Sequence, residues 1–304
     1  MTRVVVLSGG VGGGRFLRGL VEVVDPADVT VIGNVGDDVE VLGLHVSPDL
    51  DSILYALAGL NDEERGWGRA GESWRALESA SAWGGEDWFR LGDLDLGLHL
   101  VRTQALGRGE RLSGVTARLA QEAGVATCLL PATDDRLRTS VVTPAGRFSF
   151  QEWFVERRHA DEVDVVELGD AANARPAPGV LDALETADLL VFAPSNPYVS
   201  LGPILEIPRI HAALSARRVR CVAVSPLIGG RAVRGPLERM LLRMAGGTSP
   251  AHVAGCYEGL IDMLVIDAAD APAEALVPLV VTDTLMGDRH GSRRLAETVL
   301  EAAT

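Results

Sequence analysis

Lysine is absent from the 304 residues of this chain, so all 28 basic residues are arginine. This absence excludes a lysine that forms a Schiff base and also the lysine of a Walker A phosphate loop. Basic residues are outnumbered as well, because 42 Asp and Glu bring the net charge to −14. A protein this acidic has no general field that attracts nucleic acid, so we expect no nucleic-acid partner.

Cysteine is scarce, and long apolar runs are missing. Cys128, Cys221 and Cys256 form no CxxC pair, which argues against a zinc site and a disulfide framework. We expect all three to be small buried residues. No uncharged apolar run reaches the roughly 18 residues of a membrane-spanning helix, and the N-terminus lacks a signal-peptide pattern. We therefore expect a cytoplasmic protein without a membrane partner.

Short apolar segments alternate with helical ones along most of the chain. Strands are expected at residues 3–8, 28–33, 125–130, 187–193, 218–225 and 261–267, and helices at 15–24 and 49–60. The strands are continuously apolar, which is typical of parallel strands buried on both faces. The alternation predicts an α/β fold with a doubly wound, mostly parallel, Rossmann-like sheet in three layers.

Two stretches interrupt this alternation. An insertion at about 61–124 is helical and aromatic, and its first part, 61–92, is rich in Trp, Gly and charge. Residues 136–155 alternate apolar and polar side chains around a Pro-Ala-Gly turn, which predicts a β-hairpin. No repeat, low-complexity tail or clear linker divides the chain, so we expect one elaborated α/β domain over residues 1–304.

The first expected strand runs directly into a glycine-rich loop. Its candidate phosphate ligands are Ser8, Gly9, Gly10, Gly12 and Gly13. Backbone N–H groups of such a loop, together with the N-terminus of the next helix, bind phosphate. The dinucleotide pattern GxGxxG fails at Arg15, and the Walker A pattern fails there too. Phosphate binding by the backbone is therefore predicted; the alternative is a tight turn without a ligand.

Four aspartates follow the second expected strand within 15 residues. They are Asp37, Asp38, Asp49 and Asp51; Asn34 and Gly36, which come just before them, are candidate phosphate ligands. Loops that follow parallel strands meet at one edge of the sheet, so these carboxylates are expected beside the glycine loop. Carboxylates beside a phosphate site normally hold Mg²⁺, which makes all four candidate metal ligands. Helix capping and turn formation are the alternative roles.

Two later loops and one arginine extend the candidate site. Ser195 and Asn196 follow the strand at 187–193 and are candidate phosphate ligands. The loop at 225–236 adds Ser225, Arg231 and Arg234, and guanidinium groups suit phosphate; a solvated loop is the alternative. Arg90 follows two aromatic residues, where it could stack on a planar ligand or stand in solvent.

Nine segments in order closely resemble the 2-phospho-L-lactate transferase family (CofD/FbiA). They are "LSGGVGG", "NVGDD", "SPDLDSILYALAG", "WFRLGD", "LLPATDD", "FQEWFV", "APSNPYVSLGPIL", "SPLIGG" and "VRGP". The resemblance implies that a 2-phospho-L-lactyl, phosphoenolpyruvyl or phosphoglyceryl group moves from a GDP-linked donor to the deazaflavin alcohol Fo, with release of GMP, in coenzyme F-420 biosynthesis. It also implies a need for Mg²⁺, a homodimer, and contacts of Asp51 and Arg90 with Fo. Asp51 is the catalytic candidate, which could align the hydroxyl, accept its proton or hold the metal.

Four further points bear on the resemblance and on its alternatives. The family usually has Trp where this chain has Glu40. A related family of non-enzymatic regulators that bind a nucleotide sugar is the alternative; "SPDLD" and "FRLGD" favour the transferase. A nicotinamide-dependent dehydrogenase is disfavoured by the failed GxGxxG pattern. The lysine-free composition, "GGVGGGRF" and "HLVRTQ" resemble the actinobacterial branch, which uses the phosphoenolpyruvyl donor.

Overall fold

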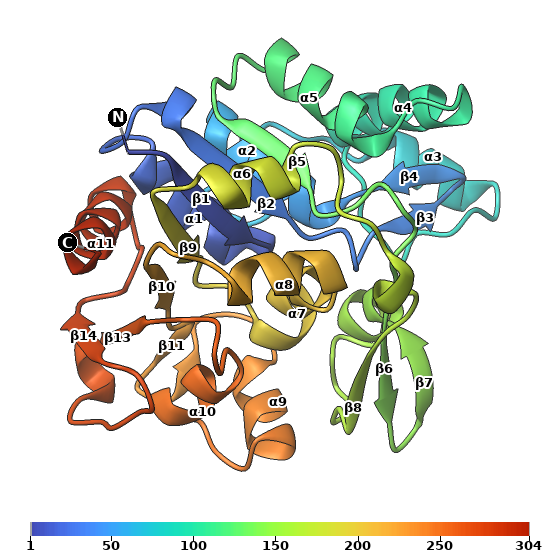
Figure 1. Cartoon of the computed structure of the whole chain (residues 1–304). Helices are drawn as coiled ribbons and strands as arrows, with labels where there is room; N and C mark the ends of the chain where they lie inside the picture. The colour runs from blue at the N-terminus through green and yellow to red at the C-terminus, as the bar shows by residue number, and fades with distance from the viewer. Residues whose placement is uncertain (1, 304) are drawn as a thin grey trace.

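The computed structural model describes residues 2–303, which contain one large seven-stranded sheet (Figure 1). The strand order is β14 (Leu279–Thr282), β13 (Met263–Asp267), β10 (Cys221–Val224), β9 (Leu189–Phe192), β1 (Val4–Ser8), β2 (Val29–Gly33) and β5 (Cys128–Pro131). Every neighbouring pair in this sheet runs parallel. The predicted doubly wound α/β fold is confirmed, and this sheet is entirely parallel.

The central strands form because their residues are apolar on both faces. Every residue of β1, β9 and β10 is buried, so these strands match the predicted continuous apolar runs. β14 was not predicted, because as an edge strand it is only partly buried and its pattern is weak. The edge also explains Cys128, which begins β5 and is exposed rather than buried; Cys221 is buried and Cys256 partly so.

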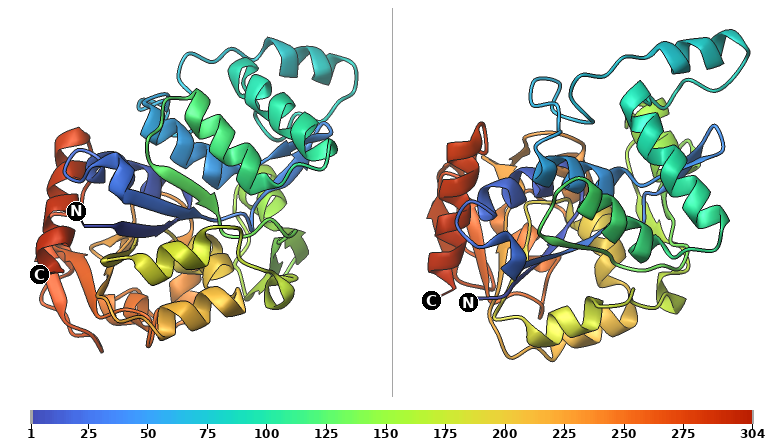
Figure 2. Two further views of the ribbon diagram at one scale, coloured as in Figure 1. Left: turned by 45° about the horizontal axis from the view of Figure 1, so that its top comes forward. Right: turned by 90° about the horizontal axis from the view of Figure 1, so that it is seen from above.

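Helices cover both faces of the sheet and produce three layers (Figure 2). On one face α1 (Gly10–Leu20) packs against α2 (Pro48–Ala58) and α11 (Arg289–Ala302), and on the other α6 (Val180–Thr186) packs against α8 (Pro208–Ser215). Further helices are α3 (Arg75–Ala82), α4 (Asp93–Gly107), α5 (Leu112–Glu122), α7 (Gly202–Leu205), α9 (Leu237–Met244) and α10 (Pro250–Gly255). No α-helix within residues 2–303 has the length and apolar character needed to cross a bilayer.

The first helix differs from the predicted one at 15–24, because the glycines themselves form its first turns. Glycine is a poor helix former, but here side chains would collide with neighbouring helices. A Cβ on Gly14 would lie 3.2 Å from the carbonyl oxygen of Ser52 in α2. A Cβ on Gly19 would lie 2.2 Å from the carbonyl carbon of Ser292 in α11. Close packing therefore overrides local propensity.

Smaller antiparallel sheets within the described residues flank the large one. They are β3 (Val39–Val41) with β4 (Leu44–Val46), β11 (Leu227–Ile228) with β12 (Arg231–Ala232), and β6 (Thr139–Thr143) between β7 (Gly146–Ser149) and β8 (Val165–Leu168). The predicted hairpin at 136–155 is confirmed only over β6 and β7. After Ser149 the chain forms a π-helical turn, Glu152–Glu156, which buries Trp153 in a separate apolar cluster together with Phe150. The third strand, β8, was not predicted.

The inserted helices lie away from the centre of the sheet (Figure 2). α4 begins at Asp93, and α3 precedes it at the periphery. Shorter helical turns are η1 (Pro26–Asp28), η3 (Ala171–Asn173), η4 (Pro197–Leu201) and η5 (Ala268–Asp270). The insertion matters because its loops and α4 reach back to the carboxyl edge of the sheet.

Candidate active site

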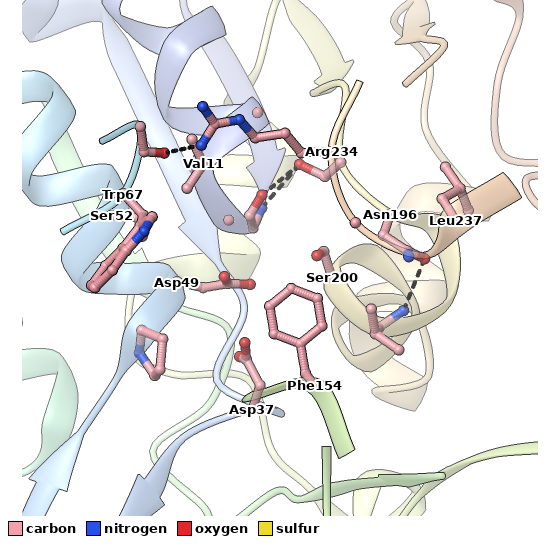
Figure 3. Close-up of a pocket in the computed structure, with 18 of the residues that line it drawn as sticks. Val11, Asp37, Asp49, Ser52, Trp67, Phe154, Asn196, Ser200, Arg234 and Leu237 are labelled. Atoms are coloured by element: carbon pink, nitrogen blue, oxygen red, sulfur yellow. Dashed lines mark hydrogen bonds between the residues drawn. The ribbon is translucent and has the colours of Figure 1, made fainter. Parts of the chain in front are cut away.

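A cavity of about 700 Å³ opens at the carboxyl edge of the large sheet (Figure 3). Strand β1 stands between β2 and β9. The chain adds β2 and β5 on one side of β1 and the later strands on the other side, so the strand order reverses at this point. Proteins with this fold bind ligands at such a switch point. Loops after four strands reach the cavity and contribute Gly9, Ser195, Ser225 and Thr284. The predicted gathering of strand-end loops is therefore what the structure has.

The glycine loop lies against the loop after β9. Ser195 Oγ donates to the carbonyl of Gly9 at 2.7 Å and accepts from the N–H of Gly9 at 3.3 Å. A Cβ on Gly12 would lie 2.5 Å from the carbonyl oxygen of Pro194, so only glycine fits there. Gly10 has φ +68°, which also favours glycine. The N-terminus of α1 faces the cavity with the carboxylate of Asp49 beside it, 2.4 Å from where a Cβ on Gly9 would stand.

Two buried aspartates face the same part of the cavity. The side-chain amide of Asn34 donates to Asp37 Oδ1 and to Asp49 Oδ2, both at 2.9 Å, and to the carbonyl of Val199 at 3.2 Å. Burial raises the pKa of Asp49 to about 7. Burial, and then the charge of Asp49, raise the pKa of Asp37 well above its ordinary value. Asn34 was predicted to bind phosphate, but its side-chain amide donates to these two carboxylates instead.

The other two predicted metal ligands point elsewhere. Asp38 Oδ2 accepts from Ser47 Oγ at 3.0 Å and lies 2.9 Å from His45 Nε2, and Asp38 does not line the cavity. Asp51 does line it, but Arg102 occupies its carboxylate. Within residues 2–303, no group of three or more His, Cys, Asp or Glu side chains is arranged to hold a metal. The four aspartates therefore do not form one cluster.

Asp51 belongs to a buried ion pair between α2 and α4. Arg102 Nη1 donates to Asp51 Oδ2 at 3.0 Å, and Nη2 donates to Oδ1. Arg102 is 1% exposed and Asp51 5% exposed. Nδ1 of His99 lies 3.3 Å from Arg102 Nη1, and burial lowers the pKa of His99 to about 4, so this imidazole is neutral at pH 7.

A second polar contact joins the same two helices. Tyr55 Oη donates to Asp95 Oδ1 at 2.6 Å, and both residues line the cavity. Burial raises the pKa of Asp95 to about 6. Burial also raises the pKa of Tyr55, so its hydroxyl keeps the proton and donates. Tyr55, Asp95, His99 and Arg102 were not predicted as site residues, although the "HLVRTQ" segment contains His99 and Arg102.

The arginines of the site differ in part from the predicted ones. Arg231 is exposed in β12 and does not line the cavity. Arg234 does line it, and its Nη1 donates to the carbonyls of Arg65 and Gly66, each at 3.2 Å. Arg15 lines the cavity directly after the glycines; burial, and then the charge of Arg234, lower its pKa. Two arginines that repel each other beside the glycine loop favour an anion between them.

Several other predicted phosphate ligands are used within the protein. Ser8, Gly13 and Gly36 are buried and do not line the cavity. The side-chain oxygen of Asn196 accepts from the N–H of Tyr198 at 2.9 Å, which caps η4. Ser225 Oγ accepts from the N–H of Leu227 at 3.2 Å, and Ser225 lines the cavity. Ser8, Gly13 and Gly36 therefore shape the loops, whereas Asn196 and Ser225 also line the cavity.

Aromatic side chains from the insertion form one wall of the cavity. Arg90 lines the cavity, and its guanidinium lies 4.5 Å from the ring centroid of Trp74. Trp67 lies beside Trp74 with ring centroids 6.2 Å apart. Arg90 therefore stacks on an aromatic ring, although not on either of its two neighbours in sequence. Glu40, where the family usually has Trp, is exposed and does not line the cavity.

A second aromatic wall comes from the π-helical turn after β7. Phe154 stacks on Phe150 with centroids 5.2 Å apart, and on His159 with the same separation. Phe154 projects into the cavity near Asp37 and Ser200 (Figure 3). The "FQEWFV" segment contained this signal, but the hairpin prediction placed these residues in a strand. Two aromatic walls in one cavity suit a ligand set with more than one planar ring.

The fold and cavity define a class: a doubly wound α/β protein in which a glycine loop, buried carboxylates and arginines meet where such proteins bind nucleotides. Residues 4–291 match the family described as 2-phospho-L-lactate transferase CofD. The chain belongs to this family. The predicted family is therefore confirmed, and with it the predicted class of activity, a transferase in coenzyme F-420 biosynthesis.

The chain is also similar to curated proteins of actinobacteria. A phosphoenolpyruvate transferase from Streptomyces griseus is 44% identical over 297 residues, which cover 92% of this chain and 93% of the relative. A protein of that name from Kitasatospora aureofaciens is 42% identical over 313 residues, 99% of this chain and 98% of the relative. These names do not favour the alternative of a non-enzymatic regulator.

A solved structure supports the fold. The crystal structure of a member of the UPF0052 family from Bacillus halodurans superposes with a TM-score of 0.64 over 99% of both chains. Its sequence is 17% identical to this chain, so the similarity concerns the fold.

Proposed function

We propose that this transferase moves a phosphorylated three-carbon acid from its GDP-linked donor to the terminal ribityl hydroxyl of Fo and releases GMP. The phosphoenolpyruvyl donor is the first choice, because curated relatives carry the name phosphoenolpyruvate transferase. The 2-phospho-L-lactyl donor is the second, from the family description, and the phosphoglyceryl donor the third. A cytoplasmic location, and a homodimer, which the resemblance implies, stay predictions.

One observation carries the proposal: the glycine loop and an ion-paired aspartate border the same cavity. Gly9, Gly10 and Gly12 at the start of α1 suit the diphosphate of the donor. Asp51 also lines this cavity, where it can accept a hydrogen bond from a hydroxyl. Arg90, on the aromatic wall of the insertion, suits the planar ring of Fo. The proposal therefore places donor and acceptor in one cavity.

The proposed reaction is a phosphoryl-type transfer. The ribityl hydroxyl oxygen attacks the phosphorus that carries the three-carbon acid, and the bond from this phosphorus to the bridging oxygen breaks. GMP leaves with that oxygen, and the hydroxyl proton passes to solvent. Such transfers need positioning and charge stabilisation more than covalent chemistry by the protein. Here Asp51 orients the hydroxyl, and Arg15 with the N-terminus of α1 stabilises the phosphate charge.

Magnesium is part of the proposal, and its proposed ligands are Asp37 and Asp49. Both carboxylates are buried and accept from the amide of Asn34. Burial disfavours their charged forms, and a cation bound between them would offset this desolvation cost. Mg²⁺ is usually held by one or two carboxylates plus substrate phosphates, which fits two aspartates rather than four. When bound there, Mg²⁺ would neutralise and orient the donor phosphates.

The product assay tests the function directly. Purified protein with Fo, Mg²⁺ and the phosphoenolpyruvyl donor is expected to form GMP and a product whose mass equals that of Fo plus phosphoenolpyruvate minus water. Mass spectrometry after parallel incubations with the three donors identifies the donor used. A protein that binds GDP and Fo but forms no product with any donor would contradict the proposal.

Arg90→Ala is expected to weaken Fo binding while GDP affinity changes by less than about threefold, which is under about 1 kcal/mol. The reason is that Arg90 lies on the aromatic wall, whereas the proposed phosphate ligands lie at the glycine loop. Fluorescence titration with Fo and calorimetry with GDP measure both. Arg75→Ala is the matched control, because Arg75 is exposed on α3 and does not line the cavity. An equal loss for both ligands in Arg90→Ala would reject the assignment.

A further inference from the structure

The ion pair of Asp51 and Arg102 has features that stability alone does not explain. Both side chains are almost completely buried, yet only Asp51 lines the cavity. Taking two charges out of water is costly, and an apolar pair of similar volume is often as stable or more stable. The arrangement is also specific, because each of the two terminal guanidinium nitrogens donates to a different carboxylate oxygen.

We infer that Arg102 is a positioning residue, which holds the Asp51 carboxylate in one orientation so that it accepts a hydrogen bond from the acceptor hydroxyl. This inference rests on the proposed function. A carboxylate offers about four lone-pair sites, and the fork of Arg102 uses two of them. The remaining sites of Asp51 stay available to a ligand in the cavity. A fixed carboxylate also spares the substrate the entropy of ordering it.

The surroundings of Arg102 hold its own side chain in place. His99 lies one turn before Arg102 on α4, and its neutral Nδ1 can accept from Nη1 at 3.3 Å. The hydrogen bond of Tyr55 to Asp95 is a second link between α2 and α4. α4 begins three residues after Arg90, which lies on the aromatic wall proposed to bind Fo. The ion pair therefore also links α4 to α2, the helix that carries Asp51. The aromatic wall and the Asp51 carboxylate are therefore positioned by the same pair of helices, α2 and α4.

A double-mutant cycle on kcat tests whether Arg102 acts through Asp51. Arg102→Met is expected to lower kcat at least about 10-fold, with the GDP dissociation constant changed less than about threefold. In an Asp51→Asn background the same substitution is expected to cause no further loss of kcat. Arg102→Lys keeps the charge but loses the fork, so its kcat should lie between wild type and Arg102→Met.

Arg217→Met is the matched control, because Arg217 also pairs with an aspartate, Asp262, at 2.9 Å and does not line the cavity. Its kcat is expected to equal that of the wild type. Equal losses of kcat from Arg102→Met in both backgrounds, or a near-normal kcat in Arg102→Met, would overturn the inference. If Arg102→Met does not fold, Arg102→Lys carries the same comparison between the two backgrounds.

The inference and the proposed function fail in different ways. A wild-type protein that forms no product from any donor contradicts the proposed function. The ion pair is then tested without substrate, by the same cycle on the urea midpoint of unfolding. Additive effects of Asp51→Asn and Arg102→Met on that midpoint would overturn the inference even then, because a carboxylate held by Arg102 must couple to it.

Discussion

Asp51→Asn is expected to lower kcat by at least about 10²-fold, a loss typical of a misplaced or unassisted nucleophile. Asparagine keeps the shape of the side chain but removes the charge that the proposed role requires. In asparagine, an NH₂ donor replaces one of the two oxygens that accept from Arg102. The side chain therefore cannot form both hydrogen bonds of the carboxylate. The measurement is kcat for product formation with saturating Fo and donor.

The same substitution is expected to destabilise the protein, because it leaves Arg102 as a buried charge without its partner. Breaking a buried pair in this way typically costs about 3–5 kcal/mol, measured here as the free energy of unfolding in urea. The control is Asp51→Asn with Arg102→Met, which removes both charges. This double variant should recover stability while kcat stays low. A stable double variant with near-normal kcat would remove Asp51 from the catalytic site.

Removal of divalent cations is expected to abolish turnover, and added Mg²⁺ should restore it. The reason is that the donor phosphates and the carboxylates of Asp37 and Asp49 would otherwise meet as like charges in a buried site. Turnover is measured in excess EDTA and again after dialysis into Mg²⁺. Full activity in EDTA would reject a metal-dependent mechanism.

Single substitutions distinguish two metal ligands from four. Asp37→Asn and Asp49→Asn are each expected to raise the Mg²⁺ concentration for half-maximal activity at least about 10-fold. Calorimetric titration of Mg²⁺ in the presence of GDP provides a second readout. Asp38→Asn is the matched control, because Asp38 is buried nearby but binds Ser47 and lies beside His45. An equal shift in Asp38→Asn would show that Asp38 is a metal ligand as well.

The strands at 3–8, 187–193 and 218–225 could be predicted because burial on both faces requires a continuous apolar run, which is visible in one segment at a time. The same reasoning failed at Leu279–Thr282, since an edge strand buries less and leaves a weaker pattern. It also failed at Phe150 and Phe154, where a hairpin pattern continued into a π-helical turn. That turn depends on the apolar cluster that Trp153 joins, which no local pattern reveals.

The site was predictable to the extent that strand-end loops of a parallel sheet must meet. Gly9, Ser195 and Ser225 were found in this way. Side-chain direction was not predictable, because it depends on the partner that each side chain meets. Arg231 and Arg234 are three positions apart, yet only Arg234 lines the cavity, where it donates to carbonyls of the insertion.

The sequence by itself determined the class of fold, the place of the glycine loop after the first strand and the family, since each depends on the order and spacing of residues along the chain. Only the tertiary structure decided how the four aspartates divide. Asp37 and Asp49 meet at Asn34, whereas Asp51 meets Arg102 from a helix 51 positions away in sequence. The physical reason is that a buried carboxylate takes the nearest donor in space, and packing of α2 against the sheet and beside α4 determines which donor that is.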